Sequence, residues 1–88
     1  MDVTDNKAEQ RFELATDAGP AIAEYRIAGD TITFTHTAVP PECEGKGVGS
    51  RLIAGALADV AARGLKVVPQ CPFVAAYLKR HPEVATLA

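Results

Sequence analysis

Polar and apolar residues alternate through the first half of the chain. Residues 11–15 alternate between polar and apolar, which predicts a strand with one buried face. The segments 21–27 and 31–39 are rich in apolar and β-branched residues, which favour strands. Gly29 and Asp30 between them are typical of a two-residue hairpin with glycine at its first central position. The first half is therefore predicted to be a three-stranded antiparallel meander.

The hydrophobic period changes after residue 50. Apolar residues between positions 52 and 61 recur at helical spacing, which predicts an amphipathic helix, and Gly64 is placed to cap its C-terminus. Residues 65–68 predict a short strand, parallel to the preceding strand because a helix connects the two. A second helix is expected over residues 72–80. Its sheet-facing residues are predicted to be Phe73, Ala76 and Tyr77.

The predicted order is β-β-β-α-β-α, an α+β fold in which an antiparallel meander is followed by one parallel strand and two helices. A chain of 88 residues has room for one hydrophobic core, so residues 9–88 are expected to form a single domain. Residues 1–8 are polar and show no period, and they are expected to form a flexible N-terminus.

Charge and cysteine usage exclude several classes of protein. The formal net charge of -2 lacks the basic excess of a nucleic-acid binder. No apolar run has the length of a membrane span, and the N-terminus resembles neither a secretory signal nor a transit peptide. Cys43 and Cys71 lie far apart and are expected to be free thiols in a reducing cytoplasm. The two cysteines and two histidines also lack the spacing of a metal site.

Three glycines occupy every second position of the segment 44–50, Glu-Gly-Lys-Gly-Val-Gly-Ser. The segment joins a strand to a helix beside a parallel neighbour, which is where α/β sheets tend to bind ligands. Unpaired N–H groups and the dipole at a helix N-terminus attract anions, and glycines allow close approach. Two common phosphate motifs do not match, since Ser50 replaces the last glycine of GxGxxG and GxxxxGK[ST] is absent. The segment therefore predicts an anion site, with a flexible turn as the alternative.

The chain resembles the GNAT superfamily of acyl-coenzyme A transferases, in particular its very small single-domain members. The resemblance rests on Ala38-Val39-Pro40-Pro41, on Gly47-Val48-Gly49, and on the stretches VVPQCPF and YLKRHPE, and it covers roughly residues 20 to 85. It implies a minimal GNAT-like fold and acetyl-coenzyme A (acetyl-CoA) as co-substrate. The acceptor would be a small amine or a protein amine. One departure is Glu44, which stands where the family has Gln or Arg and is expected to turn outward from a pyrophosphate.

The resemblance also implies roles for individual residues. The loop amides would bind the pyrophosphate of coenzyme A, with further help from the loop cations, while the strands on either side admit the pantetheine arm. The residues assigned to the cofactor are Val39, Gly45, Lys46, Gly47, Val48, Gly49, Ser50, Arg51 and Gln70.

Three side chains are candidates for catalysis. Cys71 precedes Pro72 and is expected to cap the second helix, where the thiol pKa is lowered and a nucleophile or acyl carrier is favoured. Tyr77 lies seven residues after Gln70, a spacing that in the family implies a general acid. His36 is expected to share a strand face with Phe34 and to act as a general base. Each has a purely structural alternative as a core residue.

Three functions remain open at this point. The first is acetyl transfer from acetyl-CoA to an amine, directly or through acyl-Cys71. The second is a module that binds coenzyme A without turnover. The third is an interaction domain that pairs through an exposed sheet edge. The chain is too short to enclose an acceptor, so a second copy in a homodimer or another protein would have to complete the pocket.

Overall fold

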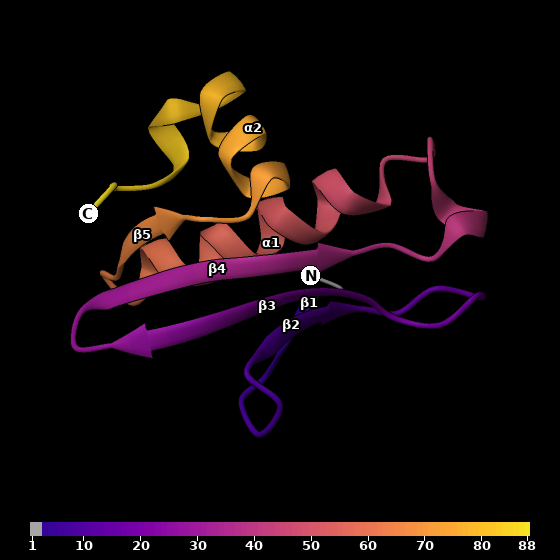
Figure 1. The fold of residues 1–88 in the computed structure, drawn as a ribbon, viewed down its shortest axis with the longest axis horizontal. Coiled ribbons are helices and arrows are strands. Elements are labelled where there is room, and N and C mark those ends of the chain that lie inside the picture. Colours follow the sequence, from indigo (N-terminus) through magenta and orange to yellow (C-terminus); the bar gives the residue numbers. More distant parts are fainter. Residues whose placement is uncertain (1–2) are drawn as a thin grey trace.

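The computed structural model describes residues 3–88 (Figure 1). Its elements are β1 (Val3–Asn6), β2 (Arg11–Leu14), β3 (Ala21–Ala28), β4 (Thr31–Ala38), α1 (Val48–Ala62), β5 (Lys66–Pro69) and α2 (Pro72–Arg80), with short 3-10 turns at Pro41–Cys43 and Pro82–Val84. The strands form one sheet in the order β1-β2-β3-β4-β5, antiparallel from β1 to β4 and parallel between β4 and β5. The predicted α+β class, with a meander followed by a parallel strand and two helices, is confirmed.

Both helices pack on the same face of the sheet. α1 lies across β1 to β4, and α2 lies beside it against β4 and β5 (Figure 1). Alternate strand residues point to this face and are buried. The largest fully buried side chains are Phe12, Phe34, Ile32, Leu52, Ile53, Leu57, Val60, Val67 and Val74. The opposite face, here called the open face, has no covering element among residues 3–88 and carries mainly polar and charged side chains.

β1 is an element that the sequence did not predict. Residues 3–6 pair with β2 in an antiparallel hairpin, so the expectation of a flexible segment is wrong for these residues. Residues 1 and 2, which the same expectation covers, lie outside the described residues. Val3 packs directly on α1 at Gly55, where a Cβ atom would lie 2.5 Å from a Val3 methyl group. Asp5 accepts a hydrogen bond of 2.5 Å from the Tyr25 hydroxyl and one from Arg63. Long-range contacts therefore stabilise a strand whose own sequence is polar.

A β-bulge changes the face on which the end of β4 lies. Glu24 pairs with His36 and Tyr25 with Phe34, so Thr35 is an extra residue with no register partner on β3. A bulge inserts one extra residue and reverses the alternation of side chains beyond it. His36 is consequently exposed on the open face with Glu24. The prediction that His36 shares the face of Phe34 is wrong, because strict alternation assumes an unbroken register.

α2 buries a different side from the predicted one. Val74 and Leu78 belong to the buried cluster, whereas Phe73 and Ala76 are exposed and Tyr77 is half-buried. The prediction is thus wrong for Phe73 and Ala76. In a helix of nine residues, the predicted set and the observed set each have the spacing of one helix face. The buried N-cap decides between them, because residues three and seven positions after Cys71 lie on its side of the helix.

The predicted turn at Gly29-Asp30 and the helix end at Gly64 are confirmed. Ala28 and Thr31 pair across a two-residue turn in which Gly29 has a φ of +61°. Gly64 follows α1 with a φ of +70°, and Leu65 N–H closes the helix by donating to Val60 O at 3.1 Å. Within residues 3–88, neither helix has the length and apolar character needed to cross a bilayer.

Candidate functional site

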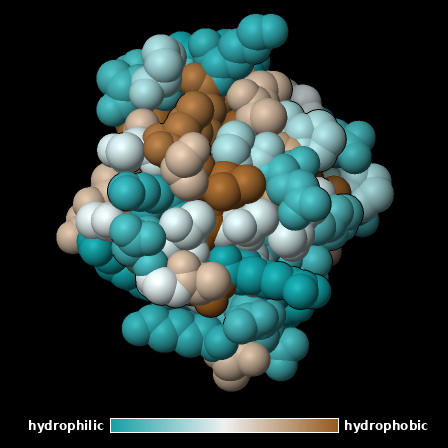
Figure 2. All heavy atoms as spheres, turned by 60° about the vertical axis from the view of Figure 1, so that its left-hand side comes forward, coloured by the Kyte–Doolittle hydropathy of each residue, from teal (hydrophilic) through white to brown (hydrophobic). Residues whose placement is uncertain are grey.

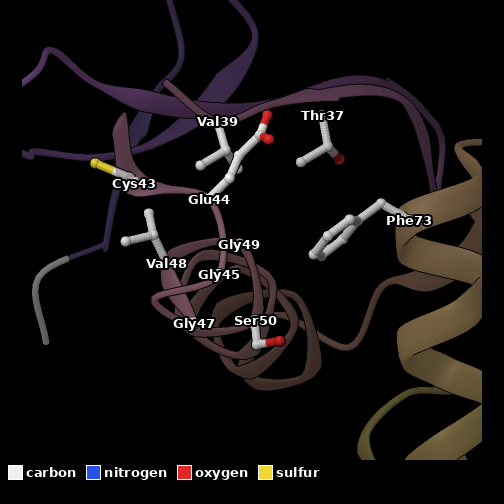
Figure 3. Close-up of a pocket in the computed structure, with 10 residues that line it drawn as sticks. All are labelled: Thr37, Val39, Cys43, Glu44, Gly45, Gly47, Val48, Gly49, Ser50 and Phe73. Atoms are coloured by element: carbon white, nitrogen blue, oxygen red, sulfur yellow. The ribbon is translucent and has the colours of Figure 1, made fainter. Parts of the chain in front are cut away.

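A pocket of about 400 Å³ lies where β4, the glycine loop and the two helices meet (Figure 3). The start of α1 and the loop form one side, the end of β4 forms another, and α2 contributes an aromatic ring. The lining residues are Thr37, Val39, Cys43, Glu44, Gly45, Gly47, Val48, Gly49, Ser50 and Phe73. The continuous stretch 37–50 and Phe73, which is far away along the sequence, thus converge at the N-terminus of α1.

The loop before α1 depends on two glycines for its path. Gly45 and Gly47 have φ values of +80° and +76°, in the left-handed region that other residues rarely adopt. Gly47 is the N-cap of α1, and its carbonyl accepts the first helical hydrogen bond, from Arg51 N–H at 3.0 Å. A Cβ atom at either glycine would meet no atom within 4 Å. These two glycines therefore serve the backbone conformation and leave open space above it.

Most backbone N–H groups of this loop have no partner. Lys46 N–H donates to Cys43 O at 3.2 Å. Among residues 3–88, no acceptor is bound by the N–H groups of Gly45, Gly47, Val48, Gly49 and Ser50. Unpaired N–H groups at a helix N-terminus carry a partial positive charge and suit an anionic ligand. The loop thus presents a set of donors beside the pocket.

Gly49 has a different role from the other two glycines. It lies inside α1 and is buried. A Cβ atom there would be 2.5 Å from the tip of the Phe73 ring, which is closer than atoms can approach. The missing side chain lets Phe73 lean from α2 onto the first turn of α1, as Figure 3 shows. This contact sets the shape of the pocket.

The side chain of Glu44 lines the pocket. In Figure 3 its carboxylate extends past Val39 toward Thr37, on the pocket side of the loop. The expectation that Glu44 turns outward is therefore wrong. A carboxylate beside unpaired N–H groups satisfies part of their charge when no other anion is bound. It would also repel an anionic ligand at short range.

Cys71 is the N-cap of α2, as predicted, and its side chain is buried. The Thr37 hydroxyl lies 3.3 Å from the Cys71 sulfur atom. Burial by itself raises the pKa of the Cys71 thiol, but the Thr37 hydroxyl and the backbone of Val74, Phe73 and Thr37 outweigh it and lower the pKa overall. Donors at the first turn of a helix have this effect because they stabilise the thiolate. Cys71 is thus a thiol with increased thiolate character.

β4 and β5 part next to this thiol. Their pairing ends at Phe34 and Pro69, and Cys71 N–H then donates to Phe34 O at 2.8 Å. Beyond this point the chain turns into α2 while β4 continues to Ala38. Thr37 contacts both the pocket and the sulfur atom, so Cys71 lies directly behind the pocket wall.

The structure divides the predicted cofactor residues into two groups. Six of them line the pocket: Val39, Gly45, Gly47, Val48, Gly49 and Ser50. Lys46 and Arg51 are exposed and do not line it, and Gln70 lines a separate hollow on the open face. The sequence indicated the glycine loop because of its unusual composition. It had no comparable signal for cofactor-binding side chains outside the loop.

The three predicted catalytic residues also lie apart. Cys71 is next to the pocket, as described above. Tyr77 is half-buried with its ring 4.6 Å from the ring of His81, and neither Tyr77 nor His36 lines the pocket. The sequence missed Thr37, because only the bulge turns it toward Cys71. It missed Phe73 as a pocket residue because an aromatic side chain in a short amphipathic helix was assigned to the core.

Comparisons with known proteins agree with this geometry at the family level. A family model described as GCN5-related N-acetyl-transferase matches residues 11–87. A search of curated proteins finds no match to the chain. Among residues 3–88, no three His, Cys, Asp or Glu side chains gather into a group able to hold a metal ion.

Proposed function

The chain belongs to the GCN5-related N-acetyltransferase family, and we propose that it transfers an acetyl group from acetyl-CoA to an amine acceptor. The observation that carries the proposal is the set of unpaired N–H groups at Gly45 and at residues 47–50, beside an open pocket. These donors suit the pyrophosphate of coenzyme A. The protein would hold the co-substrate through backbone N–H groups, without a cationic side chain in the pocket wall.

The pantetheine arm would run from the loop toward the point where β4 and β5 part. This path passes between Val39 and Phe73 and reaches Thr37, beside Cys71. In a direct transfer, the amine nitrogen bonds to the acetyl carbon, the carbon–sulfur bond breaks, and the coenzyme A sulfur takes up the proton that the amine loses. We assign no proton transfer to His36 or Tyr77, since neither side chain lines the pocket.

Cys71 offers a second route. The Cys71 thiolate would attack the thioester carbon and form a new carbon–sulfur bond, and the coenzyme A sulfur would leave and take up the proton that the Cys71 thiol lost. An amine would then attack the acetyl carbon on Cys71, and the Cys71 sulfur would leave with the amine proton. Intact-mass measurement after incubation with acetyl-CoA distinguishes the routes. We expect one acetyl group on the wild-type chain and on Cys43→Ala, and none on Cys71→Ala. An unlabelled wild-type chain that still acetylates amines, with Cys71→Ala equally active, would leave only the direct route.

The cradle itself is tested at Gly47. Gly47→Ala forces an unfavourable φ on the loop, costing roughly 1–2 kcal/mol, and we expect at least a tenfold loss of acetyl-CoA affinity by calorimetry. Gly29→Ala is the matched control, because Gly29 also has positive φ and open space but lies in the distant β3–β4 turn. Equal acetyl-CoA affinity in both variants would count against the cradle. Binding without acetylation of any amine would instead favour a coenzyme A binding module.

We extend the proposal to the acceptor and the cell compartment, with the family and the sequence as support. The acceptor is an amine of a small molecule or a protein, and the cell compartment is the cytoplasm. Because residues 3–88 leave the open face uncovered, a homodimer is a further way to enclose an acceptor. Sedimentation velocity with and without acetyl-CoA tests that arrangement.

A further inference from the structure

A second hollow of about 500 Å³ lies on the open face, on the other side of the sheet from the glycine loop. Its lining residues are Arg26, Thr33, Thr35 and Gln70. Thr33 and Thr35 come from β4, and Gln70 directly precedes Cys71. The hollow is therefore beside the same parting of β4 and β5 that the loop pocket reaches from the helix side.

Residues of the same two segments border this parting on both faces of the sheet. Thr37 and Cys71 border it from the helix side, while Thr35 and Gln70, close by along the same two segments, border it from the open face. A thioester at Thr37 and Cys71 would thus be reached by a molecule on the open face. This inference rests on the acetyl transfer proposed above.

Arg26 gives the hollow a distinct charge. Its side chain is exposed, and among residues 3–88 it makes no ion pair or hydrogen bond. Other cations of the open face and its edges are paired, Arg11 with Glu13 at 2.7 Å and Lys66 with Asp30 at 3.7 Å. Glu24, the nearest acidic residue along the strand, lies opposite Arg11. The positive charge of Arg26 is thus available to a ligand.

The other lining groups are neutral and polar. The Gln70 side-chain amide and the Thr33 hydroxyl can both donate and accept hydrogen bonds. Thr35 makes only a long bond of 3.4 Å to Glu24 O. An unpaired guanidinium suits a carboxylate and repels an ammonium group placed beside it. Simple alkylamines and polyamines fit this surface poorly for that reason.

We propose that the acetyl acceptor is an amine that carries a carboxylate, such as a free amino acid, bound in the hollow of Arg26, Thr33, Thr35 and Gln70. Arg26 binds the carboxylate, and the amino group points to the parting of β4 and β5. The acceptor nitrogen bonds to the acetyl carbon, the carbon–sulfur bond of acetyl-CoA breaks, and the released sulfur takes up the proton that the nitrogen loses.

The test compares amines that differ only in the carboxylate. Thiol release from acetyl-CoA is measured with amino acids and their decarboxylated counterparts, for instance phenylalanine and phenethylamine. In Arg26→Ala we expect kcat/KM for the amino acid to fall about 10- to 100-fold, mainly through KM, and kcat/KM for the bare amine to stay the same or rise. Arg26→Lys should keep part of the preference. The compared quantity is the ratio of kcat/KM for the amino acid to kcat/KM for the bare amine. The change of this ratio between wild type and variant does not depend on the difference between the amine pKa values.

Arg11→Ala is the matched control, since Arg11 lies on the same face but is paired with Glu13. It should leave the preference unchanged. An Arg26→Ala variant with an unchanged ratio would overturn the proposal. A second contrary outcome is a chain that binds acetyl-CoA but acetylates neither amine. In that case the affinity for N-acetylphenylalanine is measured, and equal affinity of wild type and Arg26→Ala would also overturn the proposal. Failure of acetyl-CoA itself to bind would refute the proposed function, and calorimetry on both variants separates the two cases.

Discussion

Thr37 and Cys71 are the pair of residues on which the proposed acyl-Cys71 route depends. The hydroxyl and the sulfur atom are 3.3 Å apart, and the Thr37 hydroxyl is the largest of the interactions that lower the pKa of the thiol against the effect of burial. A hydrogen bond to a thiolate favours the charged form over the neutral one. The reactivity of Cys71 should therefore depend on a residue of a different element, β4.

Thr37→Val tests this dependence, because valine has the shape of threonine without the hydroxyl. We expect the pKa of the Cys71 thiol to rise and its alkylation by iodoacetamide at neutral pH to slow several-fold. The rate is followed against pH in a Cys43→Ser background, so that only one thiol reports. Thr31→Val, on the same strand but bonded to Asp30, is the control. An unchanged pH midpoint would show that the hydroxyl does not act on the thiol.

Glu44 is the second residue with a defined electrostatic effect. Its carboxylate lines the pocket, so an incoming pyrophosphate must meet or displace it. We expect Glu44→Gln to raise the affinity for acetyl-CoA about fivefold, on the order of 1 kcal/mol, with a smaller gain at high salt. Glu42→Gln is the control, since Glu42 is exposed and does not line the pocket. Weaker binding in Glu44→Gln would mean that the carboxylate helps to hold the ligand.

At the scale of elements, two glycines of α1 serve close packing rather than backbone freedom. Gly49 admits Phe73 from α2, and Gly55 admits Val3 from β1. Neither has positive φ, and both lie in a helix that alanine would otherwise favour by about 1 kcal/mol. The sequence alone does not reveal such roles, because the contacting residues are far away along the chain.

The contact between Gly49 and Phe73 can be measured by a double-mutant cycle. In a Phe73→Ala background we expect Gly49→Ala to raise the free energy of unfolding by up to about 1 kcal/mol, through helix propensity. With Phe73 present the ring must move, and Gly49→Ala should be neutral or destabilising, a coupling of about 1–2 kcal/mol. Urea denaturation of the four proteins gives the coupling. Equal effects in both backgrounds would show that the ring does not rest on α1.

For the whole molecule, the sequence predicted the order of six elements and the loop that forms the pocket. The order of the elements and the position of the loop depend on hydrophobic period and turn residues, which are local features of the sequence, as at Gly29 and Gly64. What it did not predict depends on register and on long-range contacts. The bulge at Thr35 moved His36 away from the core, and β1 formed because Val3 and Asp5 find partners on α1 and β3. Local patterns contain little information about such contacts.

The site residues also divide into those that local sequence predicts and those that depend on long-range contacts. Glycines and a cysteine before proline are informative at the level of composition, so the loop and the N-cap of α2 were found. Thr37 and Phe73 depend on where the sheet and α2 place them. The hollow around Arg26 joins residues of β3 and β4 with Gln70, and only their assembly makes it visible.

One cluster connects three elements of the molecule and makes stability depend on pH. Tyr25 of β3 donates to Asp5 of β1, and Arg63 at the end of α1 binds both Asp5 and Asp59. Burial, followed by the bond to Asp5, raises the pKa of the Tyr25 hydroxyl from 10.0 to about 12. The folded state therefore holds the proton more tightly than the unfolded state.

The sign of the pH effect follows from that shift. The contribution of Tyr25 to the free energy of unfolding is complete below pH 10, where both states are protonated, and declines as the pH rises to about 12. A shift of about two pKa units corresponds to roughly 2–3 kcal/mol. Tyr25→Phe should therefore be less pH-dependent than wild type in this window, as measured by urea denaturation between pH 9 and pH 12. Because other groups titrate in the same range, the difference between the two proteins is the informative quantity. Parallel stability curves would show that the hydroxyl titrates alike in the folded and unfolded chains.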